Sequence, residues 1–215
     1  MHLVMSFPDF SATDTQIQWQ RFCDLLWYHD DLGFWLDVSR MHLNSAALDE
    51  LTPPLEQAFE AMKKLEAGAI ANADENRQVG HYWLRNPQLA PDQAVGQHIA
   101  AEINDIEQFG KAVISGEIKS PTGQPFTDVL WIGIGGSGLG PLLMVRALQD
   151  TGNGLPFHFF DNVDPNGMSR VLGELGDALR TTLVVTVSKS GGTPEPHLGM
   201  EQARHRVESL GGNWP

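Results

Sequence analysis

The stretch VLWIGIGGSGLGP, residues 129 to 141, decides the fold of this 215-residue chain. The apolar residues from 128 to 134 are typical of a strand that is buried on both faces of a parallel sheet. Five glycines and a serine interleave with the end of this run, and the residues after them predict a helix that ends near Leu148. A strand that turns through glycines into a helix is the first half of a β–α–β unit, and the N-terminus of such a helix can hold an anion.

The rest of the C-terminal half repeats this alternation of strand and helix. Short runs at residues 155–161 and 181–187 are rich in aromatic and β-branched side chains and predict two more strands. Asp164 and Pro165 are a cap and a first residue for the helix between them, and a last helix is expected to stop at Gly211. The alternation predicts an α/β fold with an open parallel sheet, and we expect the flavodoxin-like strand order 2-1-3.

The N-terminal half has a different pattern, which predicts a helical region. Apolar side chains recur there at helical spacing, and capping residues or prolines precede them. Helices are expected over residues 15–30, 53–65 and 91–113. Residues 76–89 show no clean period, so we expect a strand or a loop. A break rich in proline and glycine follows, and it predicts a helical domain over residues 1–120 and a parallel-sheet domain over residues 121–215.

The composition of the chain argues against several classes of function. Hydrophobic residues make up 41% and charged residues 19% of the sequence, as in globular proteins. The formal net charge of −13 opposes binding to nucleic acid and to anionic membranes, so neither partner is expected. Cys23 is the single cysteine and the first residues lack the pattern of a signal peptide, which favours a cytoplasmic protein. The spacings of zinc motifs, of a P-loop and of a nucleophile elbow are missing, and no metal ion is expected.

Two loops of the parallel-sheet region carry the chemistry of an anion site. In the order 2-1-3, the strand order reverses between the first and third strands, and ligands of such sheets bind beyond this point. The loops after these two strands are residues 133–140 and 188–193, so they are expected to face each other. Glycines allow close approach and positive φ, hydroxyls donate hydrogen bonds, and lysine adds a positive charge. The residues concerned are Gly135, Gly136, Ser137, Gly138, Ser188, Lys189, Ser190 and Thr193.

Each loop also has plainer interpretations. Residues 133–140 could be only a tight connection, and the hydroxyls of residues 188–193 could be only helix caps. Gly133, Gly135 and Gly138 also match the dinucleotide pattern G-x-G-x-x-G. Asp161 ends the next strand, where such a fold places its ribose-binding acid, so an NAD-dependent oxidoreductase is a rival hypothesis.

The pair WIGIGGSGLGP and VVTVSKSGGTPE, together with ENRQVGHYWLRN at residues 75–86, resembles the glucose-6-phosphate isomerase (phosphoglucose isomerase) family, within the wider sugar isomerase (SIS) superfamily. The resemblance implies that residues 121–215 are the first SIS domain and that no cofactor is needed. It implies a homodimer that interconverts glucose 6-phosphate and fructose 6-phosphate in glycolysis and gluconeogenesis. By this resemblance Gly136 and Ser137 lie beside the sugar. The 6-phosphate is held by Ser188, Ser190 and Thr193, with Lys189 between them.

The resemblance also implies what this chain leaves out. In the family, the catalytic glutamate and the histidine, lysine and arginine that assist it come from a second SIS domain and a C-terminal segment. Aldose–ketose exchange needs such a base. We therefore expect an N-terminal fragment with no catalytic residue and a truncated sheet. Glu195 follows the second loop, but the dipole of its helix accounts for an acidic residue there. A non-catalytic sugar-phosphate-binding module is the alternative.

Overall fold

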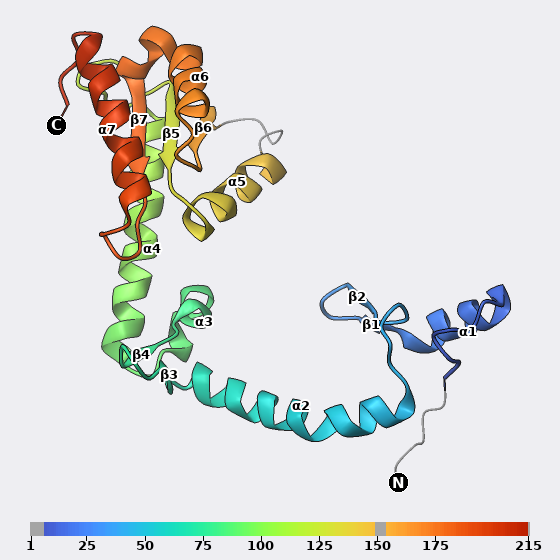
Figure 1. Ribbon diagram of the computed structural model, residues 1–215. Coiled ribbons are helices and arrows are strands. Elements are labelled where there is room, and N and C mark those ends of the chain that lie inside the picture. The colour runs from blue at the N-terminus through green and yellow to red at the C-terminus, as the bar shows by residue number, and fades with distance from the viewer. Residues whose placement is uncertain (1–6, 149–153, 215) are drawn as a thin grey trace. The chain divides into compact units, whose positions relative to one another are not determined.

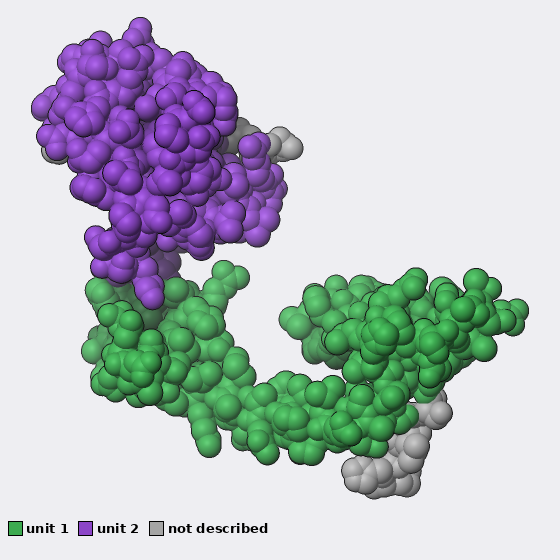
Figure 2. Space-filling model, viewed as in Figure 1, with its two compact units in different colours: residues 1–100 green, residues 101–215 purple. Residues whose placement is uncertain are grey.

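The computed structural model describes residues 7–148 and 154–214. Part of the N-terminal stretch on which the signal-peptide expectation rests lies outside these residues. The chain forms two compact units, residues 1–100 and 101–215, which are coloured separately in Figure 2. Their boundary falls within helix α4 (Gln93–Ile114), and the domain boundary expected at residue 120 stays a prediction.

The second unit contains a parallel sheet of three strands within the described ranges. They are β5 (Asp128–Ile132), β6 (Phe157–Phe160) and β7 (Thr182–Thr186), and their order is β6-β5-β7 (Figure 1). Leu130 of β5 pairs with His158 on one side and with Val184 on the other. The predicted α/β fold and the strand order 2-1-3 are confirmed.

Helices alternate with these strands as the sequence predicts. They are α5 (Gly136–Leu148), α6 (Pro165–Leu175) and α7 (Pro194–Ser209), with a 3-10 turn η3 (Gly176–Thr181) before β7. Asp164 caps α6, because its side chain accepts hydrogen bonds from the N–H groups of Asn166 and Gly167. Pro165 is the first helical residue, as expected.

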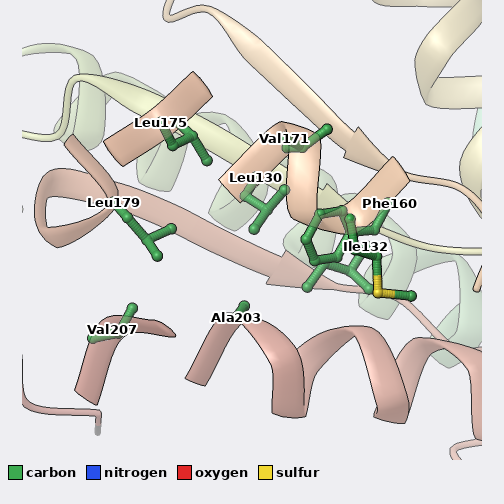
Figure 3. Packing of buried hydrophobic residues seen from close by; sticks show 9 residues of the cluster. Leu130, Ile132, Phe160, Val171, Leu175, Leu179, Ala203 and Val207 are labelled. Atoms are coloured by element: carbon green, nitrogen blue, oxygen red, sulfur yellow. The ribbon is translucent and has the colours of Figure 1, made fainter. Parts of the chain in front are cut away.

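The core of the second unit lies between one face of the sheet and helices α6 and α7. Leu130 and Ile132 of β5 are almost completely buried there, and Figure 3 shows them near Ala203 and Val207 of α7. The other members of the cluster are Phe160, Met168, Val171, Leu175 and Leu179. Because successive side chains of a strand point to opposite faces, Trp131 lies on the other face of the sheet.

Helix α7 approaches the sheet closely at Gly199. A Cβ atom placed on Gly199 would lie 2.7 Å from Cγ2 of Ile132 and 3.4 Å from Cδ2 of Phe160. Any larger side chain would therefore push α7 away from the strands. This close packing places the start of α7 at the carboxyl edge of the sheet.

The start of the first unit differs from the prediction. The helix expected over residues 15–30 is α1 (Thr15–Leu25), and it ends early. The chain continues as β1 (Leu26–His29), which pairs antiparallel with β2 (Phe34–Asp37). The turn between the strands has Gly33 at φ +57°, a conformation that favours glycine. Aromatic residues with high strand propensity fill both strands, so the hairpin competes successfully with a longer helix.

Helix α2 (Ser45–Glu66) also begins earlier than predicted. Asn44 is its N-cap, and the Asn44 side chain accepts a hydrogen bond from the N–H of Ala47 at 2.8 Å. Pro53 and Pro54 thus lie inside the helix rather than at its start, and the helix bends along its length (Figure 1). The helix formers after Asn44 outweigh the two missing N–H donors.

Residues 76–89 begin with a short strand, within the expected strand or loop, but the helical turns that follow correct the prediction. A two-residue strand, β4 (Arg77–Gln78), pairs with β3 (Ile70–Asn72). It leads into the short helix α3 (His81–Arg85) and the 3-10 turn η1 (Pro87–Leu89). Helix α4 (Gln93–Ile114) then agrees with the prediction. Among the described helices, none combines the length and the apolar character that crossing a membrane requires.

A buried arginine ties the N-terminal segments together. The side chain of Arg21 on α1 is 4% exposed, and its guanidinium donates to four backbone carbonyl oxygens. Nε donates to Ser39 at 2.8 Å and Nη1 to Pro8 at 2.6 Å. Nη2 donates to Met41 at 2.7 Å and to Leu43 at 3.0 Å. Arg21 therefore acts as a structural clamp rather than as a free cation.

Candidate sugar-phosphate site

The loops after β5 and β7 begin next to each other at the carboxyl edge of the sheet. The N–H of Val187 donates to the carbonyl oxygen of Ile132 at 2.8 Å, so the two strands end side by side. Gly133 and Ser188 come directly after these residues. The strand order reverses between β5 and β7, and this edge is therefore where a parallel sheet is expected to bind a ligand.

Two glycines of the first loop serve close packing between β5 and α5. A Cβ atom on Gly138 would collide with the carbonyl oxygen of Gly133. A Cβ atom on Gly133 would lie 2.7 Å from the carbonyl oxygen of Ser137. Gly135 has φ +56° and forms the turn between strand and helix. Gly138 was expected to help the backbone approach a ligand, but its missing side chain is explained by the contact with Gly133.

Gly136 has no such internal explanation. A Cβ atom there would meet nothing within 4 Å, so packing does not require glycine at this position. Within residues 7–148 and 154–214, the N–H groups of Gly135 and Gly136 have no acceptor. They lie at the N-terminus of α5, where free N–H groups can bind an anion or a sugar oxygen.

Ser137 is held by its backbone and free at its side chain. Its N–H donates to the carbonyl oxygen of Ile134 at 3.2 Å. Its carbonyl oxygen accepts a hydrogen bond from Nε1 of Trp131 at 2.8 Å. The described part of the chain gives the Ser137 hydroxyl no partner, and this hydroxyl is therefore available to a ligand.

In the second loop, three hydroxyl groups converge. Oγ of Ser188 donates to Oγ1 of Thr193 at 3.2 Å, and Oγ of Ser190 lies 3.1 Å from the same atom. The N–H of Gly191 donates to Oγ of Ser188 at 3.1 Å, and that of Gly192 donates to Oγ of Ser190 at 3.2 Å. Gly191 has φ +71°, which allows the loop to curl around these groups. Hydroxyls and N–H groups gathered in this way can exchange their mutual bonds for bonds to phosphate oxygens.

Thr193 does not act as a simple helix cap. It lies at the N-cap position of α7, but its side chain makes no capping hydrogen bond. Pro194 and Pro196 are the first and third residues of α7, and proline has no N–H. The Thr193 hydroxyl therefore has fewer backbone donors to accept from, and it contacts the serines instead. For Thr193, the interpretation of the loop as plain capping is wrong.

Charge at the second loop comes from Lys189 and Glu195. Lys189 is exposed, and among the described residues no hydrogen bond or ion pair holds its ammonium group. Glu195 is half-buried in the first turn of α7, where the helix dipole favours a carboxylate. The Glu195 side chain lines a small crevice between the start of α7 and the ends of β5 and β6. The other lining residues are Ile132, Gly133, Ile134, Phe160, Asn162 and Pro196.

The described residues at this edge of the sheet include no group of side chains that could bind a metal ion. Across the parts of the chain that the structure describes, no three His, Cys, Asp or Glu side chains gather in a way that could hold a metal ion. The donors at the carboxyl edge are hydroxyls, N–H groups and one lysine, which suit an anionic ligand.

Comparison with known families agrees with this geometry. A family model described as phosphoglucose isomerase matches residues 37–213, which include β5, β7 and both loops. The chain belongs to the phosphoglucose isomerase family. The match to the phosphoglucose isomerase model confirms the resemblance on which the sequence interpretation rests.

Three similar proteins are each named glucose-6-phosphate isomerase. The protein from Parasynechococcus marenigrum (strain WH8102) is 78% identical over 98% of this chain and 38% of its own length. The protein from Synechococcus sp. (strain CC9902) is 73% identical over 98% of this chain and 40% of its own length. The protein from Prochlorococcus marinus (strain MIT 9313) is 71% identical over the whole chain and 39% of its own length. This member of the phosphoglucose isomerase family thus spans about two fifths of the length of these relatives.

Proposed function

We propose that this chain is part of a glucose-6-phosphate isomerase and that its second unit binds the phosphorylated sugar. The observation that carries the proposal is the convergence of the Ser188, Ser190 and Thr193 hydroxyls beside the loop after β5. Family membership supports a sugar phosphate as the ligand. The names of relatives that are 78% and 71% identical support glucose 6-phosphate in particular.

In this proposal the second loop binds the phosphate group. The hydroxyls of Ser188, Ser190 and Thr193 donate to phosphate oxygens, and the N–H groups of Gly191 and Gly192 add two more donors. Lys189 supplies a positive charge, and its side chain is exposed beside the hydroxyl groups of the loop. Because the net charge is −13, this local set of donors has to overcome repulsion of the dianion.

The first loop contacts the sugar itself. The free N–H of Gly136 and the hydroxyl of Ser137 are both at the N-terminus of α5, and both can bond to sugar oxygens. The exchange of aldose for ketose also needs a general base and groups that stabilise an enediolate. Glu195 is already accounted for by the dipole of α7. We therefore assign binding to these loops and proton transfer to none of their residues.

The same proposal covers the organisation of the protein. A helical N-terminal domain over residues 1–120, a first SIS domain over residues 121–215, a homodimeric assembly and a cytoplasmic location all belong to it. The break rich in proline and glycine motivates the boundary, the cysteine usage and N-terminal pattern motivate the location, and the resemblance motivates the SIS domain and the homodimer. Size-exclusion chromatography with light scattering measures the assembly directly.

Thermal unfolding with glucose 6-phosphate tests the binding step. A ligand at 100 times its Kd stabilises the folded state by about 2.7 kcal/mol. We expect saturable stabilisation by glucose 6-phosphate and little by glucose, because the hydroxyl cluster binds the phosphate. Ser188→Ala and Thr193→Ala should each reduce it, whereas Ser115→Ala, which removes an exposed hydroxyl far from these loops in the sequence, should not. Stabilisation that survives both site variants would contradict the proposal.

Two assays separate the alternatives. A coupled assay for fructose 6-phosphate on the 215-residue chain should show no turnover above background, and clear turnover would refute the binding-only role. Titration with NADH tests the oxidoreductase hypothesis. We expect no NADH binding, because the family model that matches the chain is that of phosphoglucose isomerase.

A further inference from the structure

Helix α5 contains a backbone carbonyl that has lost its usual partner. In an α-helix, the carbonyl oxygen of one residue accepts a hydrogen bond from the N–H four residues later. For Ser137 that residue is Pro141, which has no N–H. The carbonyl of Ser137 therefore needs a donor from outside the helical pattern.

Trp131 supplies this donor. Its Nε1–H lies 2.8 Å from the carbonyl oxygen of Ser137. An indole N–H can only donate, so each group provides what the other lacks. The contact is possible because Trp131 is on the face of β5 opposite Leu130 and Ile132.

The hydrogen bond holds the part of α5 that faces the ligand. The N–H of Ser137 is bonded to Ile134 and its carbonyl to Trp131, so the backbone of Ser137 is held on both sides. The Ser137 hydroxyl and the N–H of Gly136 keep no partner among the described residues. A fixed backbone that carries free donors is a preorganised binding surface, since little order has to be gained when a ligand arrives.

We propose that Trp131 is a positioning residue of the sugar-phosphate site. Its indole N–H replaces the missing N–H of Pro141 and holds Ser137 in the orientation that binds the sugar. The role toward substrate rests on the proposed function, whereas the hydrogen bond itself does not. Trp131 touches no ligand in this scheme and acts through Ser137.

Trp131→Phe tests the proposal, because it keeps an aromatic ring and removes the donor. Hydrogen exchange of the α5 amides of Gly138 and Leu139 should become faster. The Kd for glucose 6-phosphate should rise about fivefold to tenfold, as expected for the loss of one hydrogen bond. Adding Pro141→Ala to this variant restores an N–H four residues after Ser137 and should recover most of the affinity. A role in packing alone would not be rescued in this way.

Trp83→Phe is the matched control. Nε1 of Trp83 donates to the carbonyl oxygen of Glu66 at 2.9 Å in the first unit, so the same type of bond is lost away from the site. It should leave the Kd unchanged. Unchanged exchange and affinity in Trp131→Phe, or no rescue by Pro141→Ala, would overturn the inference. If the wild-type chain binds no glucose 6-phosphate, the proposed function and the substrate role both fail, while the exchange rates still decide whether Trp131 holds α5.

Discussion

Replacing Gly199 with alanine is expected to destabilise the second unit, although alanine is the better helix former. The new Cβ atom would lie 2.7 Å from Cγ2 of Ile132 and 3.4 Å from Cδ2 of Phe160. These two side chains are 1% and 4% exposed, so neither can move into solvent. Overpacking of this kind costs about 1–3 kcal/mol. The change from glycine to alanine in a helix stabilises the folded state by about 1 kcal/mol. The free energy of unfolding should therefore fall by about 1 kcal/mol in total.

Gly173→Ala provides the comparison that isolates the packing cost. Gly173 is exposed in α6, and a Cβ atom there would meet nothing within 4 Å. The same gain in helix propensity should therefore appear alone, as a stabilisation of about 1 kcal/mol. The two variants should differ by about 2 kcal/mol, which is the middle of the overpacking range.

Urea unfolding followed by circular dichroism measures this difference. Thermal unfolding should show the same order, with about 2–4 °C for each kcal/mol in a chain of this size. If Gly199→Ala is as stabilising as Gly173→Ala, α7 does not approach the sheet at Gly199 as described. The close contact would then not be what places Thr193 at the carboxyl edge.

Three further predictions concern the Arg21 side chain, the core of the second unit and the carboxyl group of Asp37. Arg21→Lys should destabilise the first unit by about 2–4 kcal/mol in chemical unfolding, because one ammonium group cannot reach one buried and three partly buried carbonyls, and each group left unpaired away from water costs about 1–3 kcal/mol. Leu130→Ala should cost about 2–5 kcal/mol, whereas Leu139→Ala, at a side chain that is 63% exposed, should change the unfolding free energy by about 0.5 kcal/mol or less. Hydrogen bonds from the side chain and the N–H of Ser39 lower the pKa of Asp37, so the stabilisation they give is present above the unfolded pKa and is lost as pH falls through the folded pKa. Ser39→Ala should raise the Asp37 pKa in an NMR titration, and an unchanged pKa would contradict this assignment.

The parallel sheet can be predicted from the sequence because its signals are local. Each of the runs 128–134, 155–161 and 181–187 is apolar or β-branched, and a turn or cap follows each one. The order of the strands follows from the handedness of the crossovers and the common topologies of such sheets. In the structure each strand is one or two residues shorter than its run at one or both ends.

The N-terminal half is harder to predict because competing signals lie close together. Leu25 and Leu26 continue the helical spacing of α1, yet the pairing of Trp27 and Tyr28 with β2 ends the helix. The turn at Gly33 signals this hairpin, but it is weaker than the helical period before it. In α2, the two prolines suggest a helix start, while the cap at Asn44 sets the actual one.

At the candidate site, residue types are easier to predict than their partners. The hydroxyls after β7 are visible in the sequence, but only the fold shows that Thr193 contacts the serines instead of capping α7. The role of Trp131 is hard to predict from the sequence, because it depends on Pro141, which is ten positions away. A proline four residues after a helical serine is the signal that could reveal it, since it marks a carbonyl without a donor.

The strand order β6-β5-β7 also bears on how this chain is made. During synthesis, β5 leaves the ribosome before both of its neighbours, and Asp128 can pair with Thr182 only after two helices have followed. The strand with the most deeply buried side chains is therefore made first and has to wait for both of its neighbours. Open apolar edges recruit other chains, so we expect misassembly to be most sensitive to the rate at which residues 157–186 emerge.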